Sequence, residues 1–373
     1  MGRSFRIGKI FGIPLMVDLS FFLIFIFITV TLSIDFFPNS YEGWPDSFYW
    51  IVGIATSLLF FASLVAHETA HSIVSKRAGI PVKSITLFIL GGVAQISREV
   101  SKPKTELVMS LAGPLCSAAL GGIFYGLAYL FDGVNIYVSA LCAYLSFANL
   151  ILAVFNMIPG FPMDGGRVLR AIVWMVKKDY VQATRIATTV GYAVAGCFIV
   201  GGIFLAFTSW GFFSGLWLVF IGFFIISAAR STNQQLSMRE NLKGITAQDV
   251  MIRELPRIPR NLNIMDLIDG VLLQSPQQSF FVTDGENIIG VLTTLQVKRV
   301  PQNQRSLTTV AQVMIPITAL KTVLPTDTAL LVLAAMDESP ENLVAVIYNA
   351  QVVGIISRES IFGFAQRRQV FRS

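Results

Sequence analysis

Long apolar runs dominate the first 230 residues of the chain and do not recur after them. Six of these runs are long enough to cross a bilayer, which needs about 20 residues of helix. The six predicted spans lie near residues 14–37, 50–78, 105–131, 136–158, 186–208 and 212–229. The pattern therefore predicts an α-helical polytopic membrane region with six transmembrane helices.

Two apolar stretches need a separate interpretation. The first run follows basic residues, as in a signal peptide, but it is too long for one and lacks an A-x-A cleavage site, so we expect an uncleaved first span. The stretch Ser84–Ile96 is too short and too β-branched to span a membrane, and it contains Gly91 and Gly92. It predicts a hairpin or a re-entrant element.

Composition supports a division of the chain into a membrane part and a soluble part. Hydrophobic residues make up 54% of the sequence and charged residues 13%, whereas a typical soluble domain has about 25% charged residues. Residues 231–373 nevertheless have the mixed, turn-punctuated texture of a soluble domain. We therefore predict a transmembrane domain at 1–230, a polar linker at 231–244 and a soluble α/β domain at 245–373.

The basic residues of the membrane part lie on one side of the predicted spans. The loops of the other side, near residues 38–49, 132–135 and 209–211, contain no Lys or Arg. By the positive-inside rule both termini are cytosolic, in a multi-pass protein of the cell membrane. The formal net charge of +6 forms no single patch, so we expect the lipid bilayer and no nucleic acid as a partner. The basic residues are Arg3, Arg6, Lys9, Lys76, Arg77, Lys83, Arg98, Lys102, Lys104, Arg167, Arg170, Lys177, Lys178 and Arg185.

The soluble part repeats itself. The segment Phe281–Gly285 before Gly290 recurs as Val344–Tyr348 before Gly354, which gives two copies of a β-α unit of roughly 60 residues. This pattern resembles a tandem CBS (Bateman) module, and the resemblance implies adenine-nucleotide sensing and a homodimer.

One feature of the repeat speaks against nucleotide binding. The ribose-binding Asp that such modules often have six residues after the strand Gly is Gln296 in the first copy and Ser360 in the second, with Glu359 one position earlier. ATP or AMP binding therefore stays open beside a dimerising or substrate-docking role.

The second predicted span contains the sequence His67-Glu68-Thr69-Ala70-His71. On a helix the two imidazoles share one face about 6 Å apart, where they can bind one Zn²⁺, and Glu68 is placed to take a proton from metal-bound water. The alternative is a chance match. However, these are the only two histidines in the chain, and ionisable groups inside a membrane helix are usually functional.

A hydrolytic zinc site needs a third protein ligand and one open position. Asp164 is the best candidate, because Pro159 and Pro162 before it break the fourth span, and a broken backbone at membrane depth is tolerated where it lines a polar cavity. Spacing alone leaves open whether Asp164 only N-caps the following helix. Glu99 and Glu106 are less well placed, and the three cysteines lie in apolar stretches, where we interpret them as packing residues.

Taken together, the motifs of residues 1–230 resemble the site-2 protease family of intramembrane metalloproteases, in the subgroup that carries a CBS pair. The motifs are His67-Glu68-x-x-His71, Gly113-Pro114-x-x-Ser117 and Asn156-x-x-Pro159-x-x-Pro162-x-Asp164-Gly165. The resemblance implies one zinc ion per chain, bound by His67, His71 and Asp164, with Glu68 as the general base. Many members have Asn at the position of Ser117, and Gly91-Gly92 resembles the family's glycine loop.

The resemblance also implies a substrate class. It is a single-pass membrane protein, such as an anti-sigma factor or a membrane-tethered regulator, that is cleaved within or beside its membrane segment. Asn156 could stabilise the oxyanion or only satisfy backbone groups near Pro159. A helical substrate must unwind first, and Ile85–Ile89 could offer it a strand edge or form a simple interfacial hairpin.

Three rival interpretations remain at the level of sequence. A CBS-regulated transporter or channel would explain membrane ionisable residues, but not an HExxH motif followed by a carboxylate after a broken helix. A catalytically inactive membrane scaffold conflicts with the intact Glu68. A zinc protease of another family would need a Glu as third ligand.

Overall fold

The structure, a computed structural model, describes residues 4–89, 91–96, 100–208, 211–274, 277–337, 339, 342–349 and 351–372. The chain divides into two compact units, Met1–Gln234 and Gln235–Ser373.

Among the described residues, six helices are long and apolar enough to cross a membrane, which confirms the predicted number of spans. A shorter helix, α6, lies between the fourth and the fifth. The last spanning helix continues through residues 231–242, so most of the predicted linker is helical. The spans are Leu19–Ser40, which combines α1 (Leu19–Thr31), a π-helical turn and α2 (Phe37–Ser40), then α3 (Asp46–Arg77), α4 (Pro103–Phe131), α5 (Ile136–Asn156), α7 (Tyr180–Ala206) and α8 (Phe212–Leu242), and α6 is Asp164–Lys177.

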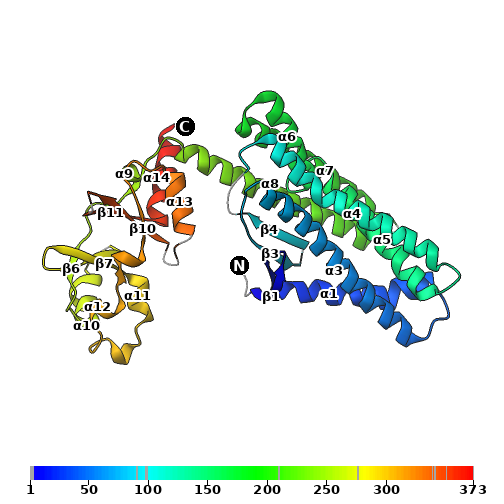
Figure 1. Ribbon diagram of the computed structural model, residues 1–373, viewed down its shortest axis with the longest axis horizontal. Helices are drawn as coiled ribbons and strands as arrows, with labels where there is room; N and C mark the ends of the chain where they lie inside the picture. The colour runs from blue at the N-terminus through cyan, green and yellow to red at the C-terminus, as the bar shows by residue number, and fades with distance from the viewer. Residues whose placement is uncertain are drawn as a thin grey trace. The chain divides into compact units, whose positions relative to one another are not determined.

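Helices α3, α4 and α5 lie side by side (Figure 1). Small residues allow the close approach, as is usual between membrane helices. A Cβ atom on Gly121 of α4 would lie 2.9 Å from Cγ of Leu150 on α5, and the Ser146 hydroxyl of α5 donates a hydrogen bond of 2.8 Å to the Gly121 carbonyl. The α4–α5 contact therefore depends on the missing side chain at Gly121.

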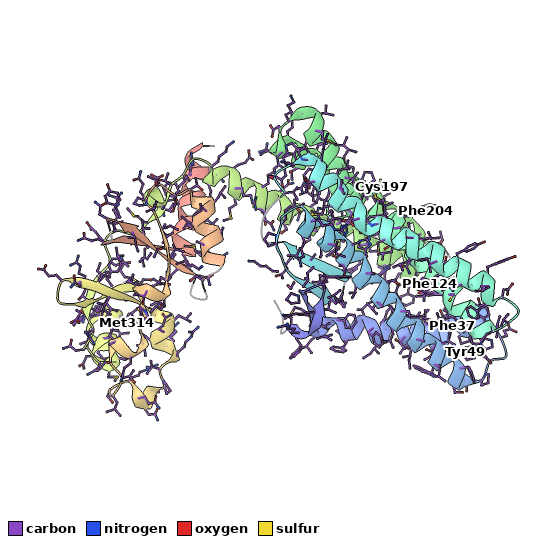
Figure 2. All side chains as sticks on the ribbon, in the orientation of Figure 1. Phe37, Tyr49, Phe124, Cys197, Phe204 and Met314 are labelled. Carbon is purple, nitrogen blue, oxygen red and sulfur yellow. The ribbon has the colours of Figure 1, made fainter. Side chains whose placement is uncertain are left out.

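Aromatic packing closes one end of the helical bundle. Figure 2 shows Phe37 and Tyr49 close together there. The Tyr49 hydroxyl donates to the Tyr41 carbonyl at 2.7 Å and accepts from the Trp44 backbone N–H at 3.1 Å, which fixes the loop between α2 and α3. This end lies far along α3 from His67 and His71.

A four-stranded sheet lies beside α3, in the order β1-β2-β3-β4. The predicted hairpin in Ser84–Ile96 is confirmed by the antiparallel pairing of β3 and β4, although Leu90 lies outside the described residues. The strands are β1 (Ser4–Ile10), β2 (Ile13–Asp18), β3 (Val82–Phe88) and β4 (Gly91–Ile96).

The start predicted for the first span is wrong, because a β-strand precedes the helix there. The predicted span begins at residue 14, whereas residues 13–18 form β2 and the helix begins at Leu19. The reason is local, because Phe11 and Gly12 have positive φ and turn the chain, and Asp18 caps the helix by accepting from the Ser20 N–H at 3.0 Å.

The strand edge suggested at Ile85–Ile89 is also wrong. In β3, Ile85 pairs with Leu15 of β2 on one side and with Ala94 of β4 on the other. Both edges of β3 are therefore occupied. Among the described strands, the edges of this sheet are β1 and β4.

The second unit, residues 235–373, is hereafter the CBS-like unit, and its structure confirms the predicted repeat. In each copy a short strand pairs in parallel with a longer one, which pairs antiparallel with the next. The register is the same in both, since Val282 pairs with Gly290 and Val346 with Gly354. The first copy has β5 (Arg257–Pro259), α10 (Ile264–Leu267), β6 (Ser279–Asp284), β7 (Asn287–Thr293) and α11 (Thr294–Arg299), and the second has β9 (Lys321–Val323), α13 (Ala329–Asp337), β10 (Leu343–Tyr348), β11 (Gln351–Ser357) and α14 (Arg358–Arg372), with α9 (Ala247–Val250), α12 (Val310–Val313) and β8 (Ile315–Pro316) beside them.

Candidate metal centre

Three side chains from two distant parts of the chain converge inside the first unit. His67 and His71 lie one turn apart on α3, and their Nε2 atoms are 3.2 Å from each other. Asp164 is the first residue of α6, and its Oδ2 lies 3.3 Å from Nε2 of His67 and 3.0 Å from Nε2 of His71. Both imidazoles are buried, and the Asp164 side chain is 12% exposed. The structure thus brings together the three residues that the sequence singled out as ligands.

This arrangement fits one zinc ion. Tetrahedral zinc with bonds of about 2.0–2.2 Å to nitrogen and oxygen has ligand atoms about 3.3–3.5 Å apart, close to the 3.0–3.3 Å found here. His71 Nδ1 lies 2.6 Å from the Met109 carbonyl, which can only accept, so Nδ1 carries the proton and Nε2 of the neutral ring presents a lone pair. Lone pairs and a carboxylate that converge repel one another unless a cation lies between them. Among the described residues, these three form the group that could hold a metal.

Helix α4 orients both imidazole rings. The Ser117 hydroxyl lies 2.8 Å from Nδ1 of His67, and the Met109 carbonyl accepts from Nδ1 of His71. Such contacts to the second ring nitrogen fix the tautomer and orientation of a metal-binding histidine. No role for Ser117 follows from the motif alone, yet Met109, Gly113 and Ser117 recur at every fourth residue and therefore share one face of α4.

Gly113 leaves the room that the histidines occupy. A Cβ atom at this position would lie 2.2 Å from Nε2 of His71 and 2.5 Å from Nε2 of His67. Contacts this short are sterically excluded, so α4 can pack against the two rings only because residue 113 has no side chain.

Glu68 points from α3 toward strand β4. A Cβ atom on Gly92 would lie 2.7 Å from Cγ of Glu68, and the backbone of Ala94 makes a hydrogen bond to the Glu68 carboxylate. The glycine pair noted in the sequence therefore begins the strand that lies against Glu68. Its small residues allow the sheet to approach the carboxylate this closely.

Asp164 is positioned by the loop before it. Met163 occupies the N-cap position of α6 and makes no side-chain cap, and Asp164 is the first helical residue, with its carboxylate directed at His67 and His71. A Cβ atom on Gly165 would lie 2.4 Å from the Met157 carbonyl oxygen, and one on Gly166 2.3 Å from the Gly160 carbonyl carbon. These two glycines let the first turn of α6 rest directly on the loop at 157–161. The alternative in which Asp164 only caps the helix does not describe this structure.

The other residues named from the sequence lie elsewhere or have other partners. Asn156 ends α5, and its side-chain amide donates to the Leu152 carbonyl at 3.0 Å, so its role toward an oxyanion stays a prediction. Glu106 is buried against Arg170 of α6. Glu99 lies outside the described residues, and Cys116, Cys142 and Cys197 are free thiols.

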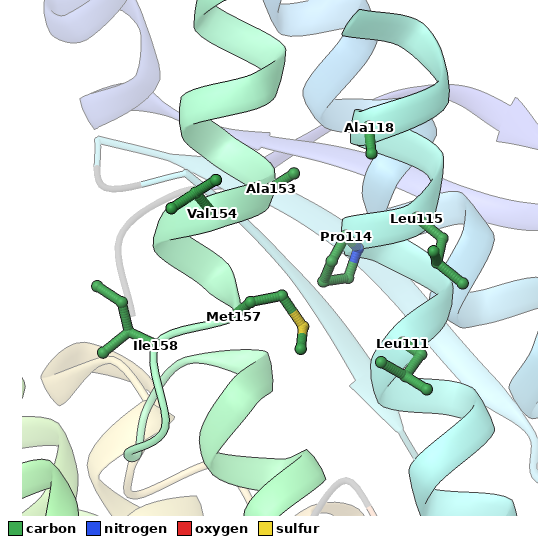
Figure 3. Close-up of a pocket in the computed structure, with 8 residues that line it drawn as sticks. All are labelled: Leu111, Pro114, Leu115, Ala118, Ala153, Val154, Met157 and Ile158. Atoms are coloured by element: carbon green, nitrogen blue, oxygen red, sulfur yellow. The ribbon is translucent and has the colours of Figure 1, made fainter. Parts of the chain in front are cut away.

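An apolar pocket of about 480 Å³ lies between α4 and the end of α5 (Figure 3). Pro114 of α4 and Met157, the residue after the last of α5, face it, and the remaining lining side chains are aliphatic. It offers no side chain for acid–base or metal chemistry, so the convergence of His67, His71 and Asp164 remains the candidate site.

In the CBS-like unit, the two residues at the ribose-binding position act as caps at the start of helices. The Gln296 side-chain oxygen accepts from the Thr293 backbone N–H at 3.2 Å, at the start of α11. The Ser360 hydroxyl donates to the Ser357 carbonyl at 2.9 Å, at the start of α14. Both side chains are thus engaged within the unit.

Comparison with known proteins gives similarity along the whole chain. Residues 55–137 and 132–198 match the model of Peptidase family M50. A Synechocystis sp. protein that carries a provisional zinc metalloprotease name is 35% identical over 373 residues, which cover 97% of this chain and 95% of that protein. The solved site-2 protease from Methanocaldococcus jannaschii is 32% identical, over 62% of this chain and 95% of that chain, with a TM-score of 0.44. A hemolysin-like protein containing a CBS domain, from Oenococcus oeni PSU, is 18% identical over 35% of this chain and 96% of that chain, with a TM-score of 0.31.

Proposed function

The chain belongs to the site-2 protease family, peptidase family M50, and is a multi-pass membrane zinc metalloprotease. We propose that it binds its zinc ion through His67, His71 and Asp164. The observation that carries this proposal is the convergence of two imidazole nitrogens and one carboxylate oxygen within 3.0–3.3 Å of one another. A CBS-regulated transporter or channel, or a catalytically inactive scaffold, needs no such ligand set.

The residues around the centre have separate roles in the proposed hydrolysis. A zinc ion held by His67, His71 and Asp164 would supply Lewis acidity for the hydrolysis. Glu68 accepts a proton from the attacking water and passes it to the leaving amine. The Ser117 hydroxyl and the Met109 carbonyl keep the two imidazole rings turned toward Asp164.

The proposed substrates are single-pass membrane proteins, such as anti-sigma factors or membrane-tethered regulators, cleaved within or beside their membrane segment. His67 and Glu68 lie ten and nine residues before the end of α3 at Arg77, so the reacting atoms lie inside a spanning helix. A peptide bond can reach this depth most readily as part of a membrane segment.

Reconstitution into vesicles tests the substrate class. We expect wild type to cut a single-pass substrate within or next to its membrane segment, as mapped by mass spectrometry, and Asp164→Ala to leave it intact. The same vesicles are expected to leave an unstructured soluble protein uncut. Equal cleavage of the soluble protein, or cuts far from the membrane segment, would contradict the proposed substrate class.

For the topology, we propose that both termini are cytosolic and that the site opens toward the cytosolic side of the cell membrane. The basic residues at the end of α3 support this, since Lys76 and Arg77 follow His71 by five and six residues. The Lys76 ammonium also donates to the Phe11 carbonyl at 3.0 Å, which places the turn between β1 and β2 at the same level.

We further propose that the unwound substrate pairs with the edge of β4, in place of the buried β3. Strand β4 lies against Glu68, and its outer edge is one of the two sheet edges among the described strands. An extended segment that added to this edge would present its backbone next to the general base.

Photo-cross-linking tests the choice of edge. A benzoylphenylalanine at Val93 of β4, 47% exposed, is expected to capture a bound substrate in a Glu68→Gln background. The same probe at Phe5 of β1, 52% exposed on the opposite edge, is the matched control and is expected to capture none. Equal capture at both edges, or capture at Phe5 alone, would refute pairing at β4.

For the CBS-like unit we propose a docking or dimerising role rather than ATP or AMP sensing. The capping contacts of Gln296 and Ser360 support this, because these side chains replace the acidic residue that would bind a ribose. Glu359, the neighbouring acid, is exposed in the first turn of α14.

A further inference from the structure

Arg170 of α6 makes polar contacts to two other helices. Its Nε donates to Oε1 of Glu106 on α4 at 2.8 Å, and its Nη2 donates to the same oxygen. Its Nη1 donates to the Tyr180 hydroxyl of α7 at 3.0 Å. The Glu106 side chain is fully buried, and that of Arg170 is 12% exposed. The pair is therefore a buried ion pair that joins α4, α6 and α7.

Two aromatic rings complete the environment of the guanidinium group. Its Cζ lies 4.7 Å from the ring centroid of Phe161 and 4.9 Å from that of Tyr180. Both distances are within the range of a cation–π contact. Phe161 belongs to the loop that supports the first turn of α6, since Gly166 rests on the backbone at residues 160–161.

The pair joins α4, which orients the histidines, to α6, which carries the carboxylate ligand. Glu106 lies three residues before Met109, whose carbonyl orients His71. Arg170 lies six residues after Asp164 on the same helix, and Phe161 lies three residues before Asp164 in the preceding loop. The contacts of Arg170 therefore connect the part of α4 that orients the histidines with both sides of the carboxylate ligand.

Stability alone is a weak reason for such a pair. Burying two charges costs several kcal/mol per ion before their attraction offsets it, and apolar residues of similar volume often stabilise a protein as well. A planar guanidinium has hydrogen-bond donors in fixed directions, so it sets the orientation and distance of the helices that it joins, which apolar residues do not.

We propose that Glu106 and Arg170 are positioning residues that set the distance between the Asp164 carboxylate and the two imidazoles. The inference rests on the proposed ligands of the zinc ion. Arg170 locks α6 and its preceding loop onto α4, and this fixes Oδ2 of Asp164 at the spacing that one small cation requires.

Zinc affinity of the full-length protein in nanodiscs tests the proposal, measured by competition with a chromophoric chelator. Arg170→Gln is expected to raise the zinc dissociation constant by about 10–100-fold, the usual cost of losing a group that orients a ligand. Arg170→Lys keeps the positive charge but lacks the planar set of guanidinium donors. Its zinc dissociation constant is expected to lie between those of wild type and Arg170→Gln. Cleavage is expected to show a lower kcat with an unchanged KM.

The double variant Glu106→Gln/Arg170→Gln separates positioning from mere stability. It leaves no lone buried charge, so its melting temperature is expected to recover toward wild type relative to either single variant. Its zinc dissociation constant is expected to remain raised. Recovery of zinc affinity together with the melting temperature would show a purely structural pair and overturn the proposal.

Two further variants complete the design. Arg260→Gln breaks the exposed pair of Arg260 and Asp284 in the CBS-like unit and is the matched control, expected to change neither quantity. If Arg170→Gln does not fold, Arg170→Lys carries the test, and an unchanged affinity in it overturns the proposal. Retention of wild-type zinc affinity in Asp164→Ala would instead refute the proposed ligand set, independently of Arg170.

Discussion

Replacing Glu68 with glutamine is expected to lower kcat by about 10²–10⁴-fold, the usual contribution of a general base, while the protein keeps one zinc ion per chain. Glutamine has nearly the same shape and can still accept a hydrogen bond from Ala94. It cannot take a proton from water. Because His67, His71 and Asp164 are unchanged, the zinc content should not fall. The measurements are single-turnover cleavage of a reconstituted substrate and metal analysis of the purified protein.

Two controls give this result its meaning. His67→Ala is expected to lose both zinc and cleavage, since one of two imidazole ligands is gone. Glu286→Gln, in the exposed turn between β6 and β7, is expected to change neither. Cleavage by Glu68→Gln at the wild-type rate would exclude Glu68 as the base. Loss of zinc from the same variant would make it a ligand.

The local parts of the site could be predicted from the sequence, because helical spacing alone puts His67 and His71 on one face. Asp164 was harder, since it lies 97 residues from His67 and spacing could not separate a ligand from a helix cap. The similarity to a protease family supplied that step. The Met109 carbonyl had no signal at all, because every residue has a backbone carbonyl.

The fold likewise has parts that local sequence patterns predict and parts that they do not. The six spans followed from hydropathy, which is a local property of each segment. The N-terminal hairpin was missed because β2 and α1 form one continuous apolar run, and only Asp18 marks the boundary between them. The position of β3 inside the sheet depends on the parallel pairing of Leu15 with Ile85, 70 residues apart, which no local pattern encodes.

A side chain at Gly113 is expected to disturb zinc binding strongly. Gly113→Ala is expected to raise the zinc dissociation constant by about 100-fold or more, at the upper end of what disturbed ligand geometry costs, and to abolish cleavage. The new Cβ would lie 2.2 Å from Nε2 of His71 and 2.5 Å from Nε2 of His67. Neither ring can turn away, because Met109 and Ser117 hold the opposite nitrogens. Helix α4 must therefore move, and the ligand atoms separate.

Gly122→Ala is the matched control on the same helix, since a Cβ atom there would have no other atom within 4 Å. Alanine favours a helix over glycine by roughly 1 kcal/mol, so this variant is expected to keep zinc and cleavage and to melt at the same or a slightly higher temperature. The two substitutions add the same methyl group to the same helix, and they differ only in whether the metal ligands lie next to it. Full zinc content in Gly113→Ala would show that the histidines do not bind the metal at the positions proposed here, because a methyl group and the two nitrogens cannot share that space.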